Sequence, residues 1–302
     1  MQSFYFLHET EEATPPSDSI LYNHPLTLLH EEELVNIGQS GREKYGESFV
    51  SNKKQTFKLG TLGAGDFDLR INAITKADAQ TSYTVLVNGA EMGKISVSAT
   101  SGSYSFASEG WYEETIHLDT ESELEVTLQY EPGSAKVELA RLNYIEAVGN
   151  WATDAPGYTQ ITLEKALEMK DYQFASVKVI GRVENQDLHA LPHCDMLIVT
   201  APAYLSEANR LAEYRRSHDG LSVTVLTPEK IYNEFSSGGQ DPTAIRLLTK
   251  KLQPRYLLLM GKGHYDNQKI DRQYFLPSYE TDYSLAETSS CVCDDYFGFI
   301  ED

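Results

Sequence analysis

Residues 194–227, CDMLIVTAPAYLSEANRLAEYRRSHDGLSVTVLT, decide the fold together with residues 255–264, RYLLLMGKGH. Three short runs within them, residues 196–200, 221–226 and 256–260, are rich in Leu, Ile and Val and carry no internal charge. Strands that are buried on both faces have this composition, because helices cover a parallel sheet above and below. These segments therefore predict three strands of a parallel sheet.

Helical patterns separate the three runs. Before the third run, Asp241 and Pro242 supply an N-cap and a proline for the first turn, and Lys250 and Lys251 lie near the expected C-terminal end. Between the first two runs, apolar residues recur at helical spacing: Leu205, Ala208, Leu211 and Ala212. The order strand–helix–strand–helix–strand predicts an α/β subdomain with right-handed parallel crossovers.

Length and charge narrow the classes of protein. The chain has 302 residues, enough for two domains, and its formal charge is −20 from 45 acidic and 25 basic residues. Such a surface repels phosphate backbones, and we expect no nucleic-acid partner. The acidity serves solubility, or calcium binding in acidic loops such as Asp294-Asp295 and Glu301-Asp302.

The ends of the chain bear on its cellular location. No apolar stretch is long enough to span a membrane, and the opening MQSFYFLHETEE has acidic residues where a signal peptide needs basic ones. The protein is therefore cytosolic, or the chain is a piece of a longer one. The closing FGFIED favours the second alternative, since no helix follows to cover the sheet.

The N-terminal half has a different pattern of apolar and polar residues. We expect residues 1–50 to form an N-terminal segment with an acidic helix over 28–37, and residues 51–150 to form an antiparallel β-sandwich domain. Its seven or eight short alternating runs are TFKLGTL, FDLRINAI, YTVLVNG, KISVSA, ETIHL, ELEVTLQY and KVELARLNYI, with Asn88-Gly89 as the sharpest hairpin signal. Residues 151–302 then form the α/β subdomain, and its first part has patterns that suit a helix over 161–172 and a strand over 175–183.

Candidate reactive groups are few. Ligands of open α/β sheets bind beyond the carboxyl ends of the strands, where this chain has Gly261-Lys262-Gly263-His264. His264 is either a base or ligand, or a turn histidine in contact with solvent. Cys291 and Cys293 stand beside two carboxylates, which raise a thiol pKa and oppose activation. Neither a G-x-S-x-G nor an H-E-x-x-H motif is present, and G-K-G is not a nucleotide-binding motif.

A binding module is the alternative class of function. The β-sandwich domain would then engage cargo, a glycan or a partner protein, with the α/β part as its scaffold. Trp111, Tyr112 and Tyr104 lie near loop-like glycines and could form an aromatic platform. The competing interpretation places these three rings in the core or at a sheet edge.

Several segments closely resemble the gingipain-type cysteine peptidases: YNEFSSGGQDPTAIR, YLLLMGKGHYDN, LPSYETDYS and CDDYFGFIED. Within that family, the chain is most similar to the sortase-like peptidases of the type IX secretion system. The resemblance implies a caspase-like α/β fold after β-rich sequence, incomplete at its C-terminus. It also implies a protein secreted to the bacterial outer membrane or cell surface, which processes C-terminal sorting signals together with other type IX secretion components.

The family also implies where the reactive groups lie. Its catalytic His, in a G-H-G motif, and its catalytic Cys follow the DDYFG segment, so they are expected downstream of Asp302 and this chain is expected to be inactive alone. No cofactor is required, although calcium is possible at Asp294 and Asp295. By alignment with the arginine-specific members, Asp294 would bind substrate at the base of the primary specificity pocket. Alternatively, Asp294 and Asp295 cap a turn.

Overall fold

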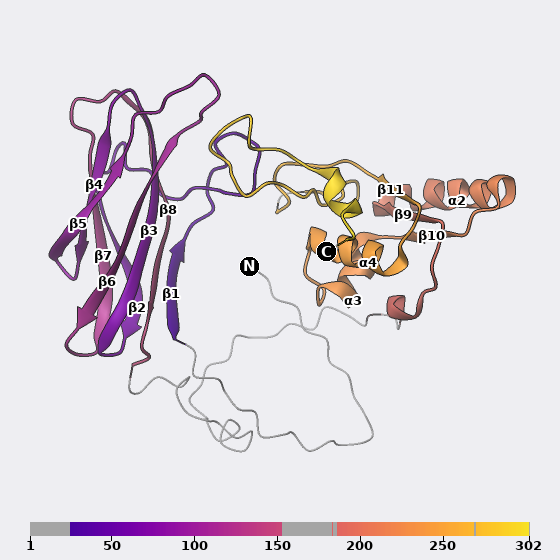
Figure 1. The fold of residues 1–302 in the computed structure, drawn as a ribbon, viewed down its shortest axis with the longest axis horizontal. Coiled ribbons are helices and arrows are strands. Elements are labelled where there is room, and N and C mark those ends of the chain that lie inside the picture. The colour runs from indigo at the N-terminus through magenta and orange to yellow at the C-terminus, as the bar shows by residue number, and fades with distance from the viewer. Residues whose placement is uncertain (1–24, 153–182, 184–185, 269, 302) are drawn as a thin grey trace, which may run out of the picture. The chain divides into compact units, whose positions relative to one another are not determined.

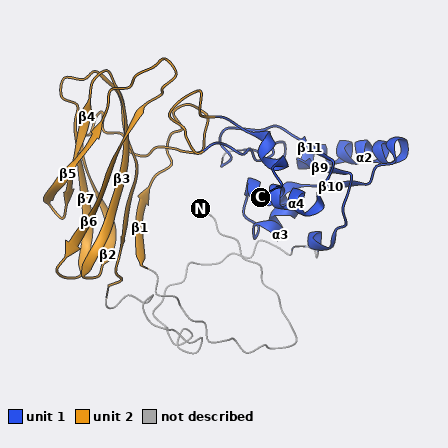
Figure 2. Ribbon diagram, viewed as in Figure 1, with its two compact units in different colours: residues 1–12, 176–281, 291–302 blue, residues 13–175, 282–290 orange. Residues whose placement is uncertain are grey.

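The computed structural model describes residues 25–152, 183, 186–268 and 270–301. The chain divides into two compact units, coloured separately in Figure 2. One unit contains residues 13–175 and 282–290, and the other contains residues 1–12, 176–281 and 291–302. The first is called the sandwich unit below, and the second the α/β unit.

The sandwich unit contains two antiparallel sheets of four strands each (Figure 1). The strand order in one sheet is β1 (Leu26–Glu31), β8 (Val137–Gly149), β3 (Gly65–Ala77) and β6 (Ser108–Leu118). The order in the other is β2 (Lys54–Leu62), β7 (Ser122–Glu131), β4 (Thr81–Val87) and β5 (Ala90–Val97). Each of the seven alternating runs forms a strand, so the predicted sandwich is confirmed.

Alternation along the strands builds the core between the sheets. In β3, Phe67, Leu69, Ile71 and Ala73 are buried, while Asp68 and Arg70 point to solvent. This two-residue period directs every second side chain to the same face of a sheet. The turn between β4 and β5 uses Asn88 at φ 48° and Gly89 at φ 83°. Two consecutive positive φ angles fit the right-handed twist of a hairpin, and the predicted turn is confirmed.

The helix predicted over residues 28–37 is wrong. Residues Leu26–Glu31 form strand β1, which pairs antiparallel with β8, and its residues alternate between half-buried and exposed. This segment has a two-residue as well as a helical pattern of apolar side chains. Pairing with the free edge of β8 satisfies its backbone hydrogen bonds and decides between the two.

In the α/β unit, β9 (Met196–Thr200) lies between β10 (Val223–Leu226) and β11 (Tyr256–Met260), and both pair parallel with it. Helix α2 (Leu205–Asp219) packs on one face through Ala208 and Ala212, beside Ile198 and Val223. The other face packs against α3 (Pro228–Phe235), which the sequence patterns missed, and α4 (Pro242–Leu252). The predicted parallel sheet, covered on both faces, is confirmed.

Local signals in the α/β unit have the expected effects. The Asp241 carboxylate accepts a hydrogen bond of 2.7 Å from the backbone N–H of Thr243, so it caps α4 as its sequence position predicted. The possible helix over 161–172 and most of the possible strand over 175–183 lie outside the described residues. Among the helices that the structure describes, none is long and apolar enough to cross a membrane.

Candidate functional site

The DDYFG segment forms a short 3-10 helix, η3 (Asp294–Gly298), held against α4. Phe297 is fully buried in the same apolar cluster as Ile245 and Leu248 of α4. The Tyr296 hydroxyl lies 3.0 Å from Oγ1 of Thr243. These contacts fix the backbone that carries Asp294 and Asp295.

Arg246 makes two further contacts from α4 to this segment. Its guanidinium carbon lies 5.2 Å from the ring centre of Tyr296, and its Nε donates a hydrogen bond of 2.5 Å to the carbonyl of Phe299. The Tyr296 ring also stacks on Tyr279 with centroids 3.6 Å apart. A planar cation over an aromatic ring is favourable, so Arg246 orders the segment through charge as well as hydrogen bonding.

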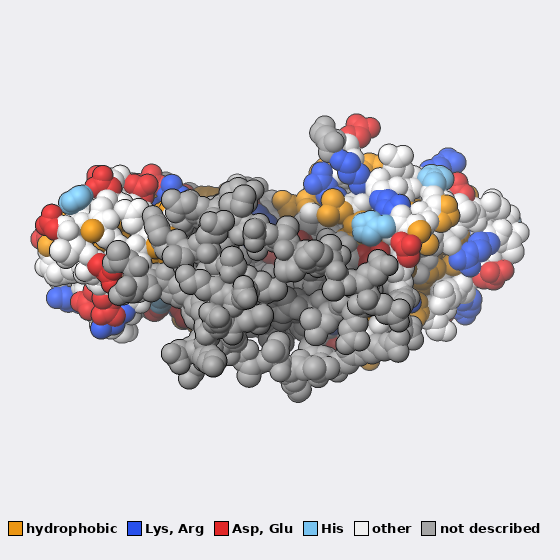
Figure 3. Space-filling model, turned by 90° about the horizontal axis from the view of Figure 1, so that it is seen from below, with side chains coloured by type: hydrophobic (Ala, Val, Ile, Leu, Met, Phe, Trp, Pro, Cys, Tyr) orange, Lys and Arg blue, Asp and Glu red, His pale blue; other side chains and the backbone are white. Residues whose placement is uncertain are grey.

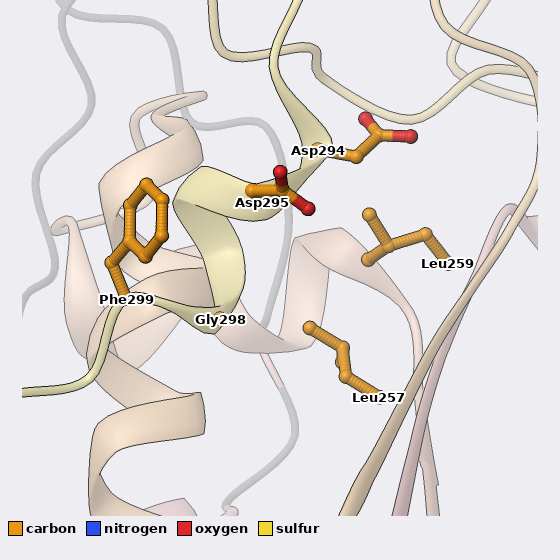
Figure 4. Close-up of a pocket in the computed structure, with 6 residues that line it drawn as sticks. All are labelled: Leu257, Leu259, Asp294, Asp295, Gly298 and Phe299. Atoms are coloured by element: carbon orange, nitrogen blue, oxygen red, sulfur yellow. The ribbon is translucent and has the colours of Figure 1, made fainter.

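An open hollow of about 540 Å³ lies between η3 and β11. It is lined by Leu257, Leu259, Asp294, Asp295, Gly298 and Phe299 (Figure 4). Leu257 and Leu259 project from β11 toward η3, and the two carboxylates lie on the side of η3 that faces them. An apolar wall opposite two carboxylates suits a side chain with an apolar stem and a cationic head, as in arginine or lysine.

The acidic pair does not by itself make a calcium site. Among the described residues, no group of three or more His, Cys, Asp and Glu side chains is placed to hold a metal ion. Calcium takes six to eight oxygen ligands, so Asp294 and Asp295 would need several more from backbone or water. Calcium at these two residues stays a prediction.

His264 makes its contacts within its own loop. Its Nδ1 accepts a hydrogen bond of 2.9 Å from the backbone N–H of Asp266, and its ring stacks on Tyr265. Its backbone N–H donates to Oγ of Ser278 at 3.2 Å. An Nδ1 that accepts leaves the proton of the neutral ring on Nε2. This is the geometry of a turn histidine.

The thiols lie in two different environments. Cys291 is exposed, and its backbone N–H donates to the Thr281 hydroxyl, while the backbone N–H of Cys293 donates to the carbonyl of Tyr279. Cys194 is buried, and burial raises the pKa of its thiol. In the part of the chain that the structure describes, no hydrogen bond joins a cysteine sulfur to His264.

The carboxyl ends of the strands are covered by the chain itself. The backbone N–H of Ala203 donates to the carbonyl of Gln273, and that of Leu276 donates to the carbonyl of Lys262. A Cβ on Gly261 would lie 2.8 Å from the Leu276 side chain, and one on Gly263 would lie 2.6 Å from the Ser278 hydroxyl. The two glycines therefore permit close packing of this loop and do not form a cradle for phosphate.

The three aromatic residues proposed for a platform separate in the structure. Tyr112 is buried in the sandwich core, as the competing interpretation had it, whereas Tyr104 and Trp111 are 59% and 46% exposed. Three residues that line the hollow beside η3 have no sequence motif that marks them as pocket residues: Leu257, Leu259 and Phe299. Two-residue alternation places Leu257 and Leu259 on one face of a strand, but no local signal indicates that η3 lies opposite.

Comparisons with known proteins agree with this architecture. Residues 189–302 match the family model of peptidase family C25, so the predicted resemblance to the gingipain-type peptidases is confirmed. Among solved structures, dimeric latent PorU from Porphyromonas gingivalis superposes with a TM-score of 0.70 at 24% identity. The match covers 92% of this chain and 34% of that chain, so this chain spans about a third of the length of that PorU chain. It supports the fold, a sandwich followed by an α/β region.

Two other solved structures match this chain with TM-scores below 0.5. A family 35 carbohydrate binding module from Clostridium thermocellum has a TM-score of 0.27 at 14% identity, covering 43% of this chain and 91% of that module. An isomalto-dextranase from Arthrobacter globiformis has a TM-score of 0.23 at 19% identity, covering 31% and 16%. No curated protein sequence matches this chain.

Proposed function

We propose that this chain, whose residues 189–302 match peptidase family C25, is the N-terminal part of a gingipain-like cysteine peptidase. The sandwich unit precedes the first half of the catalytic α/β domain, and the catalytic His and Cys follow Asp302 in the complete protein. The observation that carries the proposal is the hollow between η3 and β11, which lies within the matched residues. This chain then supplies substrate recognition and the rest of the enzyme supplies the chemistry.

The hollow would receive the side chain that precedes the cleaved bond. Asp294 would pair with the cationic head of an arginine or lysine, and Leu257 and Leu259 would pack against its methylene stem. A bidentate contact from guanidinium to carboxylate favours arginine over lysine at such a site. Arg246 and Tyr296 would hold Asp294 in place by ordering η3.

A further part of the proposal concerns the biological setting. The enzyme would act at the bacterial outer membrane or cell surface and remove C-terminal sorting signals from cargo of type IX secretion, with other components of that system as partners. A thioester on the downstream cysteine would then pass the acyl group to water or to an amine acceptor. The likeness in fold to PorU, at 24% identity, is compatible with this setting.

The test uses the complete protein encoded by the gene and fluorogenic peptides that differ in the residue before the cleaved bond. We expect cysteine-dependent cleavage after arginine, and Asp294→Asn should lower kcat/KM by about tenfold or more, since charge-assisted hydrogen bonds contribute about 1.5–3 kcal/mol. The matched control is Glu301→Gln, an exposed carboxylate near the same segment.

Two outcomes contradict the proposal. One is a complete coding sequence without a downstream His and Cys. The other is turnover by residues 1–302 alone that is abolished by Cys291→Ala or Cys293→Ala, because the nucleophile would then lie within this chain. If Asp294→Asn leaves the preference for arginine unchanged, then Asp294 does not bind the substrate side chain, although the assignment as a peptidase still stands.

A further inference from the structure

The outer face of the β1-β8-β3-β6 sheet carries an exposed aromatic pair. Strand register places Trp111 of β6 opposite Asn72 of β3, and Asn72 opposite Tyr144 of β8, which in turn pairs with Glu31 of β1. These four residues form one row across the sheet. The Trp111 and Tyr144 rings meet edge to face with centroids 6.1 Å apart, and Trp111 is 46% exposed. A half-exposed indole on a sheet face is available to a ligand.

Charged residues line both sides of this row. The next row along the strands contains Glu113, Arg70, Glu146 and Leu29, also related by register. Arg70 pairs with both of its neighbours: its Nε lies 2.9 Å from Glu113, and its guanidinium lies 3.7 Å from Glu146. These two rows are called the Trp111 face below, together with Glu109 of β6 and with Glu43, whose partner Tyr45 packs in one cluster with Ile74 of β3. On this side of the aromatic pair, the positive charge of Arg70 therefore offsets much of the negative charge of Glu113 and Glu146.

The other side of the aromatic row is acidic. The Asn72 amide donates to Glu109, and Glu43 accepts a hydrogen bond of 2.8 Å from the buried Tyr45 hydroxyl. Burial raises the pKa of Glu43, and the neighbouring Glu109 and Glu31 raise it further. Among the described residues, no lysine or arginine forms an ion pair with Glu31, Glu43 or Glu109.

Aromatic rings and carboxylates meet at one place on this face. Burial raises the pKa of the Tyr144 hydroxyl, the Arg70 guanidinium lowers it, and Glu146, Glu113 and Glu43 raise it. Of the other cations close to this row in the chain or the sheet, Arg141 donates to the carbonyl of Gly46, and Arg42, next to Glu43, pairs with Asp282. The face therefore has exposed aromatic surface beside three carboxylates, Glu31, Glu43 and Glu109, that form no ion pair with a described lysine or arginine. A ligand that complements both features is a planar cation.

We propose that the Trp111 face binds an arginine side chain of a partner polypeptide. The guanidinium stacks on Trp111 and Tyr144 and donates hydrogen bonds to Glu43 and Glu109, which gain the cation that the fold does not supply. Every residue involved belongs to the sandwich unit, so the proposal does not depend on the peptidase function. In Figure 3, acidic and basic side chains intermingle over the part of the sandwich unit that is visible at the left.

The experiment is calorimetric titration of the full chain with the peptide Ac-Ser-Arg-Ser-Arg-Ser-NH2 and with its citrulline counterpart, which keeps the shape and removes the charge. We expect the arginine peptide to bind and the citrulline peptide to bind at least tenfold more weakly. Trp111→Ala should weaken binding roughly 2- to 30-fold, the range for loss of a cation–π contact. Glu43→Gln should also weaken it while raising the melting temperature, a pair of effects that partial unfolding does not produce.

Matched controls are Tyr104→Ala, another exposed aromatic residue of the same unit, and Glu123→Gln, an exposed carboxylate on β7 of the other sheet. Both should bind the arginine peptide as the parent chain does. Three outcomes overturn the proposal, and the first is that the arginine peptide does not bind. The second is equal weakening of binding by Glu43→Gln and Glu123→Gln, which would indicate diffuse attraction to an acidic chain. The third is Trp111-dependent binding of cellohexaose in place of the peptide, which would indicate a saccharide site.

Discussion

Truncation of Phe297 should unfold the α/β unit at lower denaturant and leave the sandwich unit intact. The ring is fully buried and packs with Ile245, Leu248 and Leu257, so Phe297→Ala leaves a cavity in that core. Substitutions of this kind cost about 3–5 kcal/mol of unfolding free energy. With a urea m-value of about 2 kcal/mol/M, the midpoint should fall by roughly 1.5–2.5 M.

Two optical probes separate the units in this experiment. Helices α2, α3 and α4 all belong to the α/β unit, so circular dichroism at 222 nm reports on it. The two tryptophans, Trp111 and Trp151, belong to the sandwich unit, so their fluorescence reports on that core. We expect Phe297→Ala to lower the urea midpoint measured by circular dichroism and to leave the midpoint measured by tryptophan fluorescence unchanged.

The control is Phe299→Ala, two residues along, where the ring is 57% exposed. This change should alter the free energy of unfolding by no more than about 0.5 kcal/mol, as is usual for exposed positions. Equal destabilisation by the two substitutions would refute the claim that Phe297 anchors η3. A fluorescence transition that shifts together with the circular dichroism would refute the claim that each unit has an independent core.

Three further predictions concern the cap, the hairpin and the acidic group. Asp241→Ala removes the hydrogen bond to the backbone N–H of Thr243 and should cost about 0.5–2 kcal/mol, measured by urea unfolding at 222 nm, whereas Asp241→Asn should cost much less. Gly89→Ala should cost roughly 1–2 kcal/mol in the fluorescence transition, because φ is 83° there and no atom lies within 4 Å to clash, so backbone strain is the whole effect. Glu43→Gln should raise the melting temperature at pH 7. Folding raises the pKa of the Glu43 carboxyl above its ordinary value of 4.5, so the folded state binds the proton more tightly than the unfolded state. The stability of the parent chain therefore falls as the pH rises through the folded-state pKa, and a neutral glutamine side chain at this position avoids this loss. A melting temperature of Glu43→Gln that is lower at pH 7, or a difference that is larger at pH 4 than at pH 7, would contradict the last of these.

Local patterns were reliable wherever neighbouring residues decide the structure. The runs at 196–200 and 256–260 are rich in Leu, Ile and Val and are only 5 residues long. A helix of that length would make little more than one turn, so the two runs form strands, with the predicted bounds. Asp241-Pro242 and Asn88-Gly89 act on the backbone within two residues, and both had their predicted effects. Helix α3 was missed because it spans only eight residues, although its apolar face and Pro228 in its first turn are both helix signals.

The candidate site was only partly accessible to such patterns. A family resemblance singled out Asp294, but its opposite wall comes from β11, some 35 residues earlier, and the contacts that order η3 come from α4. Side chains alternate between the two faces of β6, so one of Trp111 and Tyr112 had to be exposed and the other buried. Which of the two is buried depends on which face of the sheet packs against the core, and the sequence of β6 alone does not decide this.

The sequence by itself determined the two classes of structure in the chain, seven of the eight strands of the sandwich, the parallel strands of the α/β unit and the turns and caps between them. Only the tertiary structure decided that β9 is central, that residues 26–31 pair with β8 as a strand, and that Trp111, Asn72 and Tyr144 share a row. The physical reason is range. Backbone preference and side-chain period act over a few residues, whereas strand partners and register are selected by the burial and hydrogen bonding of segments far apart in the chain.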